Sequence, residues 1–263
     1  MKKIMVFALC AVLMLGMLAG CSKASGEGKL VLATSADYPP FEFHMLDESG
    51  NDVIVGIDVS VAEKIAEDMG LELEIVDMAF ENLLTAMDKG EADIVIAAME
   101  YDEERAKTAD FSDPYYTDLP PMILVKAKDV DKFTDLNSFS GMVVGAQTST
   151  TKADIVTEQM PGAELLSLTT VTDLVNNLVY DKCSALVLDG AVAMQYAASN
   201  ADLVVCEAVS LGEAAPYRVA VKKGDPKGLL ESINKTIAQI TSDGTIDSYI
   251  DQAGANSQYA LEG

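Results

Sequence analysis

The feature that most constrains the fold of this chain is the regular alternation of short apolar runs with amphipathic stretches after Leu30. The short runs have the length of buried strands, and the amphipathic stretches repeat their apolar residues at helical spacing. In the first part of the chain they predict strand, helix, strand, helix and strand at 30–34, 59–68, 71–76, 81–89 and 94–98. This order predicts the α/β class, a mostly parallel sheet with helices on both faces.

A second series of the same kind follows. It predicts strands at 142–146, 164–168, 185–188 and 203–206, with helices at 151–159, 171–180 and 192–199. Two similar units in succession indicate two lobes rather than one wide sheet. Apolar runs at 122–126 and 217–221 have strand character and would carry the chain to the second lobe and back. Helices expected at 226–242 and 245–253 would then return to the first lobe.

The amino terminus has the form of an export signal. Two lysines precede an apolar run over residues 4–18, which is too short to span a bilayer comfortably. The run ends in Leu18-Ala19-Gly20-Cys21, which resembles the bacterial lipobox, where the signal is cut before a cysteine that is then acylated. We expect a signal peptide at 1–20, then a lipidated Cys21 and a small, polar tether over 21–29. The alternative is an ordinary signal peptide that contains a cysteine.

The acidic composition excludes several classes of partner and site. The formal charge of −24 argues against nucleic acid and against an anionic membrane bound through a basic face. The single histidine, His44, lies in a polar hairpin stretch, where we expect an exposed turn residue. With one histidine and no metal-ligand spacing of cysteines, a Cys/His zinc site cannot be assembled. We therefore expect no metal and no cofactor.

Only Cys183 and Cys206 would remain in the folded part of the exported chain. One lies at the start of a predicted parallel strand and the other at the end of another, so they should sit toward opposite edges of the second sheet. A disulfide requires Cα atoms within about 7 Å of each other. We expect two free, largely buried thiols.

Several segments, taken in order, carry a resemblance to a known family. They are 34–43 (TSADYPPFEF), 56–59 (GIDV), 90–94 (GEADI), 103–105 (EER), 110–116 (DFSDPYY), 144–151 (VGAQTSTT), 186–189 (LVLD) and 219–225 (VAVKKGD). Together they resemble the polar amino-acid-binding proteins of ABC importers, solute-binding protein family 3. The resemblance implies a periplasmic-binding-protein type II-like fold with two hinge strands. Lobe 1 would comprise 30–122 plus 217–263, and lobe 2 would comprise 123–216.

The resemblance also implies a function in amino-acid transport. Such a protein captures a free polar or cationic amino acid by hinge closure and delivers it to the permease and ATPase of an ABC transporter. It would be an exported, lipid-anchored monomer on the outer face of the cell membrane, or on its periplasmic side, and not an enzyme. Two alternatives stay open. One is an exported dehydratase of prephenate-like or arogenate-like substrates, with Glu100 as its acid. The other is a sensory lipoprotein.

The family pattern assigns roles in the cleft between the lobes. Arg105 should bind the ligand's α-carboxylate in a forked, charge-assisted pair, and Asp189 should bind its α-ammonium. Thr150 and Thr151, at a helix amino terminus, should add hydrogen bonds to the same carboxylate. Without the pattern, Arg105 would be interpreted as a surface arginine paired with an acid such as Asp102, and Asp189 as a helix cap.

Two aromatic residues and three departures from the family pattern complete the expected site. Tyr38 and Phe80 match positions that sandwich the ligand's side chain, although core aromatics are commoner. Ser35 replaces a frequent acidic residue near that side chain, and Ala98 lacks a hydroxyl that some members use for the ammonium. Glu100 stands where the family usually has serine or threonine. It would repel the ligand carboxylate unless it turns away, pairs with the arginine or meets a cationic ligand group.

The lipobox predicts the behaviour of one variant. In cells, Cys21→Ser should leave the protein uncleaved or unacylated, because the acylated thiol is lost, whereas the wild type should partition with membranes. Cell fractionation with labelled palmitate measures both properties. Soluble, unacylated wild-type protein in the membrane-free fraction would contradict the anchor.

Overall fold

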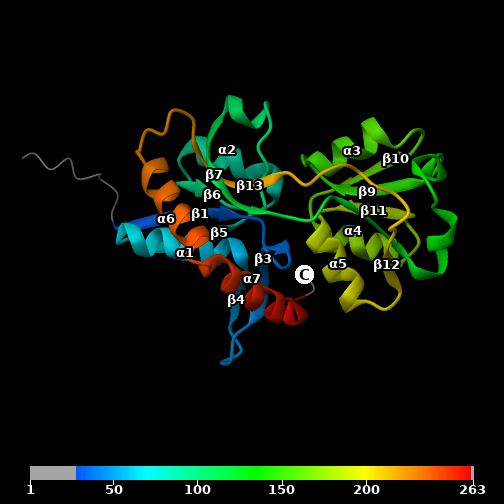
Figure 1. Cartoon of the computed structure of the whole chain (residues 1–263), viewed down its shortest axis with the longest axis horizontal. Helices are drawn as coiled ribbons and strands as arrows, with labels where there is room; N and C mark the ends of the chain where they lie inside the picture. The colour runs from blue at the N-terminus through cyan, green and yellow to red at the C-terminus, as the bar shows by residue number, and fades with distance from the viewer. Residues whose placement is uncertain (1–27, 262–263) are drawn as a thin grey trace, which may run out of the picture.

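The computed structural model describes residues 28–261, so the predicted signal peptide, Cys21 and most of the tether lie outside the described residues. Within this range the chain forms two five-stranded sheets side by side, each covered by helices (Figure 1). A three-stranded antiparallel sheet accompanies the first. The predicted α/β class and two-lobed type II-like arrangement are confirmed.

The first sheet combines amino-terminal strands with one from late in the chain. Its order is β5-β1-β6-β13-β7, with β1, β5 and β6 parallel and β13 antiparallel to both neighbours. The apolar pattern does not predict β7, an edge strand interrupted by Pro114. The strands are β1 (Lys29–Thr34), β5 (Glu72–Asp77), β6 (Ile94–Val95), β7 (Ala109–Thr117) and β13 (Pro216–Lys222).

The second sheet has the order β10-β9-β11-β8-β12. Strands β9, β10 and β11 are parallel, and β8 is antiparallel to β11 and β12. Every residue of β11 is buried, as expected for a strand covered on both faces. The strands are β8 (Met122–Lys126), β9 (Val143–Gln147), β10 (Glu164–Leu168), β11 (Ala185–Leu188) and β12 (Leu203–Val205).

Helices cover both faces of each sheet. On the first sheet α1, α6 and α7 pack on one another on one side, and α2 packs on the other. On the second sheet α4 and α5 share one core with β8 and β11, and α3 packs on the opposite face. Within residues 28–261, no helix is both long enough and apolar enough to cross a membrane. The helices are α1 (Ile57–Met69), α2 (Leu83–Lys89), α3 (Thr151–Gln159), α4 (Val171–Val179), α5 (Gly190–Ser199), α6 (Leu230–Ser242) and α7 (Thr245–Asn256).

The chain passes between the two sheets twice, through the segments 118–121 and 206–215. The apolar runs expected to make the crossings lie inside the sheets instead, as β8 and β13. Strand pairing satisfies the backbone N–H and C=O groups of such buried runs, which a free-standing connection would leave without partners. The lobe boundaries expected at 122/123 and 216/217 stay a prediction.

His44 lies in a different environment from the one expected from the sequence. This residue lies on strand β3 (Glu42–Leu46), and the turn itself lies between β3 and β4 (Asp52–Val55). Its Nδ1 is 2.8 Å from Asp52 Oδ1, and its Nε2 is 3.4 Å from Asp77 Oδ2. Its side chain is 32% exposed. The expectation of an exposed turn histidine is therefore wrong, because His44 lies on a strand that holds its partly buried ring between two acids.

The two cysteines behave as the sequence predicts. Cys183 lies just before β11 and Cys206 directly after β12, and these strands run in the same direction because both are antiparallel to β8. The two thiols therefore lie at opposite ends of their strands. Both are free and buried, and burial raises the pKa of Cys183 to about 11.

Candidate functional site

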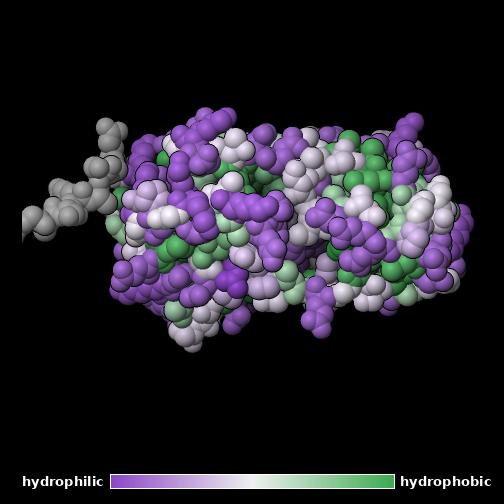
Figure 2. Space-filling view, turned by 90° about the horizontal axis from the view of Figure 1, so that it is seen from above, coloured by the Kyte–Doolittle hydropathy of each residue, from purple (hydrophilic) through white to green (hydrophobic). Residues whose placement is uncertain are grey.

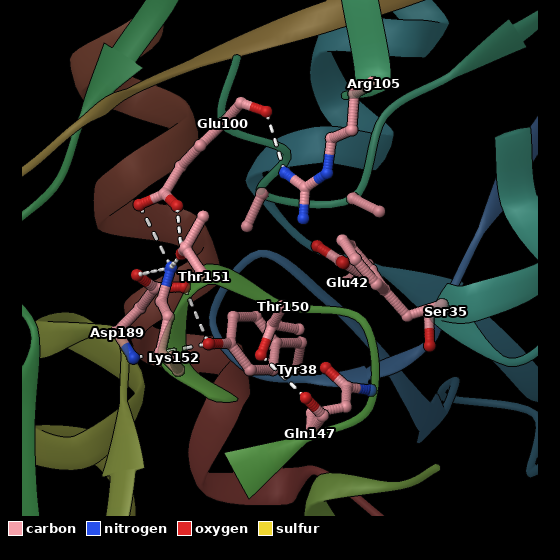
Figure 3. Close-up of a pocket in the computed structure, with 13 residues that line it drawn as sticks. Ser35, Tyr38, Glu42, Glu100, Arg105, Gln147, Thr150, Thr151, Lys152 and Asp189 are labelled. Atoms are coloured by element: carbon pink, nitrogen blue, oxygen red, sulfur yellow. Dashed lines mark hydrogen bonds and ion pairs between the residues drawn. The ribbon is translucent and has the colours of Figure 1, made fainter. Parts of the chain in front are cut away.

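A closed pocket between the two lobes brings together all nine site residues predicted from the sequence. These are Ser35, Tyr38, Phe80, Ala98, Glu100, Arg105, Thr150, Thr151 and Asp189. Four more residues line it that the sequence did not predict: Glu42, Ala97, Gln147 and Lys152 (Figure 3). The pocket volume is about 20 Å³, which on this scale holds about one or two water molecules. In the space-filling view the lobes touch, with a narrow recess between them (Figure 2).

A sharp backbone turn brings the first sheet to the pocket. Strand β6 ends at Val95, earlier than the predicted strand 94–98, and Ala98 adopts a left-handed conformation with φ of 45°. The Ala98 N–H donates to Asp58 Oδ2 at 2.6 Å, and the Tyr115 hydroxyl donates to Asp58 Oδ1 at 2.7 Å. These bonds to a fully buried carboxylate fix the segment that leads to Glu100.

Arg105 begins the short 3-10 helix η2 (Arg105–Lys107) and lines the pocket. Its Nε is 2.9 Å from Asp102 Oδ2, so it makes the local ion pair and also lines the cleft. Its Nη1 donates to the Glu100 carbonyl oxygen at 2.8 Å, and its Nη2 donates to the Ser149 carbonyl oxygen of the other lobe at 3.1 Å. Burial lowers the pKa of Arg105, but a guanidinium starts so high that it stays charged. The ring of Phe80 lies beneath it, 5.3 Å from Cζ.

The amino terminus of α3 forms the opposite wall. Thr150 is the N-cap: its hydroxyl accepts from the Ala153 N–H at 3.4 Å and donates to the Gln147 carbonyl oxygen at 2.7 Å. Thr151 is the first helical residue, and its hydroxyl donates to Glu100 Oε2 across the cleft. Residues at this junction can therefore cap the helix and line the pocket at the same time. The amino terminus of a helix also favours anions nearby.

Lys152 is one of the lining residues that sequence reasoning missed. Its Nζ lies 3.0 Å from Glu100 Oε1 and 2.5 Å from Asp189 Oδ1, and its side chain is only 6% exposed. Burial lowers the pKa of Lys152, but the charges of Asp189 and Glu100 outweigh that effect and raise it above the usual value. The signal that could have identified Lys152 is its position in the first turn of a helix, where a positive charge interacts unfavourably with the helix dipole.

Asp189 joins the two lobes from the end of β11. The Tyr38 hydroxyl, from strand β2 (Asp37–Tyr38) of the first lobe, donates to Asp189 Oδ2 at 2.7 Å. Asp189 occupies the N-cap position of α5, but its side chain makes no capping hydrogen bond and contacts Tyr38 and Lys152 instead. A second contact between the lobes lies nearby, where the Val171 N–H at the start of α4 donates to Asp37 Oδ2 at 2.5 Å.

A buried acid, Glu42, lines the pocket from the first lobe beside Ser35 (Figure 3). It is 1% exposed, and burial, followed by the neighbouring Asp58, raises its pKa well above the usual range. Burial also raises the pKa of Asp58 to about 6. The Glu42 carboxyl therefore holds its proton more strongly than an exposed glutamate does, whereas Glu100 and Asp189 are ion-paired with Lys152.

The described part of the chain, 28–261, contains no group of three or more His, Cys, Asp or Glu side chains arranged to hold a metal ion. The acids of the pocket have other partners: Lys152 contacts two of them, and Asp58 lies beside the third.

Comparison with known proteins places the chain in a family. Residues 30–254 match the bacterial extracellular solute-binding proteins, family 3. The chain belongs to this family. This agrees with the resemblance seen in the ordered sequence segments, and the matched region includes every residue of the pocket.

Similar members include proteins named as arginine binders. The chain is 32% identical over 228 residues to the arginine-binding extracellular protein ArtP of Bacillus subtilis, covering 85% of each protein. An amino acid ABC transporter substrate-binding protein of Streptococcus pneumoniae, solved bound to L-arginine, has a TM-score of 0.82 and 40% identity, covering 87% of this chain and 94% of that one. The ancestral amino acid-binding protein AncCDT-1, a precursor of cyclohexadienyl dehydratase, has a TM-score of 0.75 and 31% identity, covering 86% and 94%.

The raised pKa of Glu42 predicts how stability depends on pH. The folded protein keeps a proton that the unfolded chain releases, so this contribution to the free energy of unfolding is full below the usual pKa of 4.5 and is lost as pH rises above it. Ligand-free wild type should therefore be less stable in urea at pH 8 than at pH 5. Glu42→Gln should reduce the difference by about 1 kcal/mol or more, because the amide has no proton to lose.

Glu72→Gln is the control for this measurement, since Glu72 is an exposed acid on β5 of the same lobe. It should leave the pH dependence as in the wild type. A Glu42→Gln variant with the wild-type dependence would contradict the assignment of a buried, protonated carboxyl at this position.

Proposed function

We propose that the protein captures a free amino acid in this pocket and delivers it to the permease and ATPase of an ABC importer. The observation that carries the proposal is the presence of a cation from the first lobe, Arg105, whose side chain is 11% exposed, and a buried anion from the second, Asp189, in one closed pocket. A zwitterion between two lobes needs these two groups and the exclusion of water, which strengthens both interactions.

The ligand's α-carboxylate would bind to Arg105. Each of its Nη1 and Nη2 atoms donates one hydrogen bond to a backbone carbonyl, which leaves one N–H on each nitrogen for a forked contact. The amino terminus of α3, behind Thr150 and Thr151, would add its unpaired backbone N–H groups to the same carboxylate. The α-ammonium would bind at Asp189, whose Oδ2 is held in place by Tyr38.

The ligand's side chain would point toward Glu42, Ser35 and Phe80, and we propose that it is cationic. A buried acid such as Glu42 becomes a charged partner when a guanidinium or ammonium arrives, and Phe80 offers a ring face for it. The arginine-bound relative from Streptococcus pneumoniae supports the same class of ligand. Arginine, lysine and ornithine are the candidates.

Entry of the ligand would require the lobes to separate, because side-chain contacts between the lobes close the pocket. The contacts that must break on opening join opposite lobes: Thr151 and Lys152 with Glu100, Arg105 with Ser149, Tyr38 with Asp189, and Asp37 with the start of α4. The segments 118–121 and 206–215 connect the sheets and would act as the hinge.

The protein would act outside the cytoplasm as a monomer held to the membrane by lipidated Cys21, as the lipobox indicates. The dehydratase alternative assigns Glu100 as its acid. Glu100 is ion-paired with Lys152 and accepts a hydrogen bond from Thr151, and a carboxylate in that arrangement is an acceptor only. This arrangement counts against Glu100 as a proton donor.

Arg105→Met should abolish tight amino-acid binding. It removes the cation for the α-carboxylate, and truncating one partner of a buried charge pair costs about 2 to 5 kcal/mol, or at least about 30-fold in Kd.

A thermal-shift screen of the wild type against the common amino acids identifies the ligand, since ligand at a hundred times Kd adds about 2.7 kcal/mol of stability. Calorimetry then compares the variant with the wild type.

Arg218→Met is the matched control, because Arg218 is the other arginine of the chain and donates to a backbone carbonyl, that of Ser112, away from the pocket. It should bind the ligand as the wild type does. Wild-type affinity in Arg105→Met would overturn the proposed site, and a wild type that binds no amino acid would overturn the function.

A further inference from the structure

Lys152 bridges the two lobes at the charged end of the pocket (Figure 3). It comes from the first turn of α3 in the second lobe, and Glu100 comes from the first lobe. Lys152 also contacts Asp189, and the three side chains are 6 to 7% exposed. A lysine at this depth must be paired, since an uncompensated buried charge is strongly destabilising.

Glu100 also lies next to the place proposed for the ligand's carboxylate. Its backbone carbonyl accepts from Arg105 Nη1 at 2.8 Å, and its side chain accepts from Thr151 at the amino terminus of α3. Both of these neighbours belong to the proposed carboxylate-binding wall. Without Lys152, the negative charge of Glu100 would face the ligand's carboxylate in a site with little water, where like charges repel strongly.

Counting the charges shows what Lys152 changes. Of the ion-paired side chains that line the pocket, Glu100 and Asp189 are negative and Arg105 and Lys152 are positive, so these four are balanced. Asp102 pairs with Arg105 from outside the lining. A zwitterionic head group then enters without adding net charge. Removal of Lys152 would leave one excess negative charge, which favours a ligand with an ammonium and no carboxylate.

We propose that Lys152 is a specificity-determining residue that neutralises Glu100 and thereby lets the site prefer amino acids to the corresponding amines. The inference rests on the proposed function, because it assumes that Arg105 binds a carboxylate. Lys152 acts through Glu100 and Asp189 and does not need to touch the ligand. Its charge would let the site accept amino acids and reject the corresponding amines.

The test compares L-arginine with agmatine, which is the same molecule without its carboxylate. Calorimetry of Lys152→Met should show arginine affinity reduced at least about 30-fold, while agmatine affinity stays within about threefold of wild type or rises. The ratio of the two affinities would fall at least about tenfold. A purely structural role for Lys152 would weaken both ligands alike, so the ratio separates the two explanations.

Three further variants make the test independent of folding defects. Lys152→Arg keeps the cation and should keep the preference for arginine. Glu100→Gln/Lys152→Met removes both charges of the pair and should recover most of the preference lost in Lys152→Met. Lys126→Met is the matched control, because Lys126 is a buried lysine of the same lobe, 2.8 Å from Asp181 and outside the pocket. It should leave the ratio unchanged.

Several outcomes would overturn the inference. Equal losses for both ligands in Lys152→Met would do so, and so would a double variant that prefers arginine no more than Lys152→Met does. Tighter arginine binding in Lys152→Met would show that the lysine competes for the ammonium position instead. If the wild type binds no amino acid at all, the proposed function fails and this inference fails with it. If the wild type binds arginine and the ratio does not move, the inference alone fails.

Discussion

The pairing of buried charges across the two lobes is the interaction on which the closed structure depends. Glu100, Lys152 and Asp189 lose nearly all contact with water, and each such ion would cost several kcal/mol if left alone. The network is complete only when the lobes meet, because Glu100 and Tyr38 come from one lobe and Lys152 and Asp189 from the other. Closure and charge compensation are thus one event.

The same constraint explains how binding and motion are coupled. On opening, water replaces the partners of these groups, so the open form carries little electrostatic penalty. On closing around a ligand, the carboxylate, the ammonium and the resident ions must all be compensated together in a low-dielectric space. A ligand that lacks one of these charges leaves a buried group without a partner, and the closed state then loses stability relative to the open state. Selectivity for ligands that carry both charges therefore follows from the requirement that the lobes close.

Much of the fold could be predicted from local sequence pattern. Strands β8, β10 and β11 and helix α3 begin and end where the pattern places them, because each has an apolar run or a periodic stretch with a clear boundary. Strand β7 was missed because its aspartates and Pro114 break the apolar pattern, although it pairs along most of β13. Helix α6 starts at Leu230, later than expected, because the Asp225 carboxylate accepts from the Leu229 and Leu230 N–H groups in the preceding turn.

The site was only partly accessible to sequence reasoning. Residues carried by ordered family segments, such as Arg105 and Asp189, were found. Lys152 and Glu42 were missed because their importance lies in contacts with residues far along the chain. Lys152 meets Glu100, 52 positions earlier, only through closure of two separately folded sheets. The three alternatives for Glu100 that the sequence offered all omit Lys152, which is its actual partner.

A crystal structure of the protein with bound L-arginine tests the central claim most directly. The account predicts closed lobes, the ligand carboxylate within hydrogen-bond distance of both Nη atoms of Arg105, and Lys152 still between Glu100 and Asp189. A carboxylate bound away from Arg105, or a Lys152 side chain displaced from Glu100 by the ligand, would contradict it.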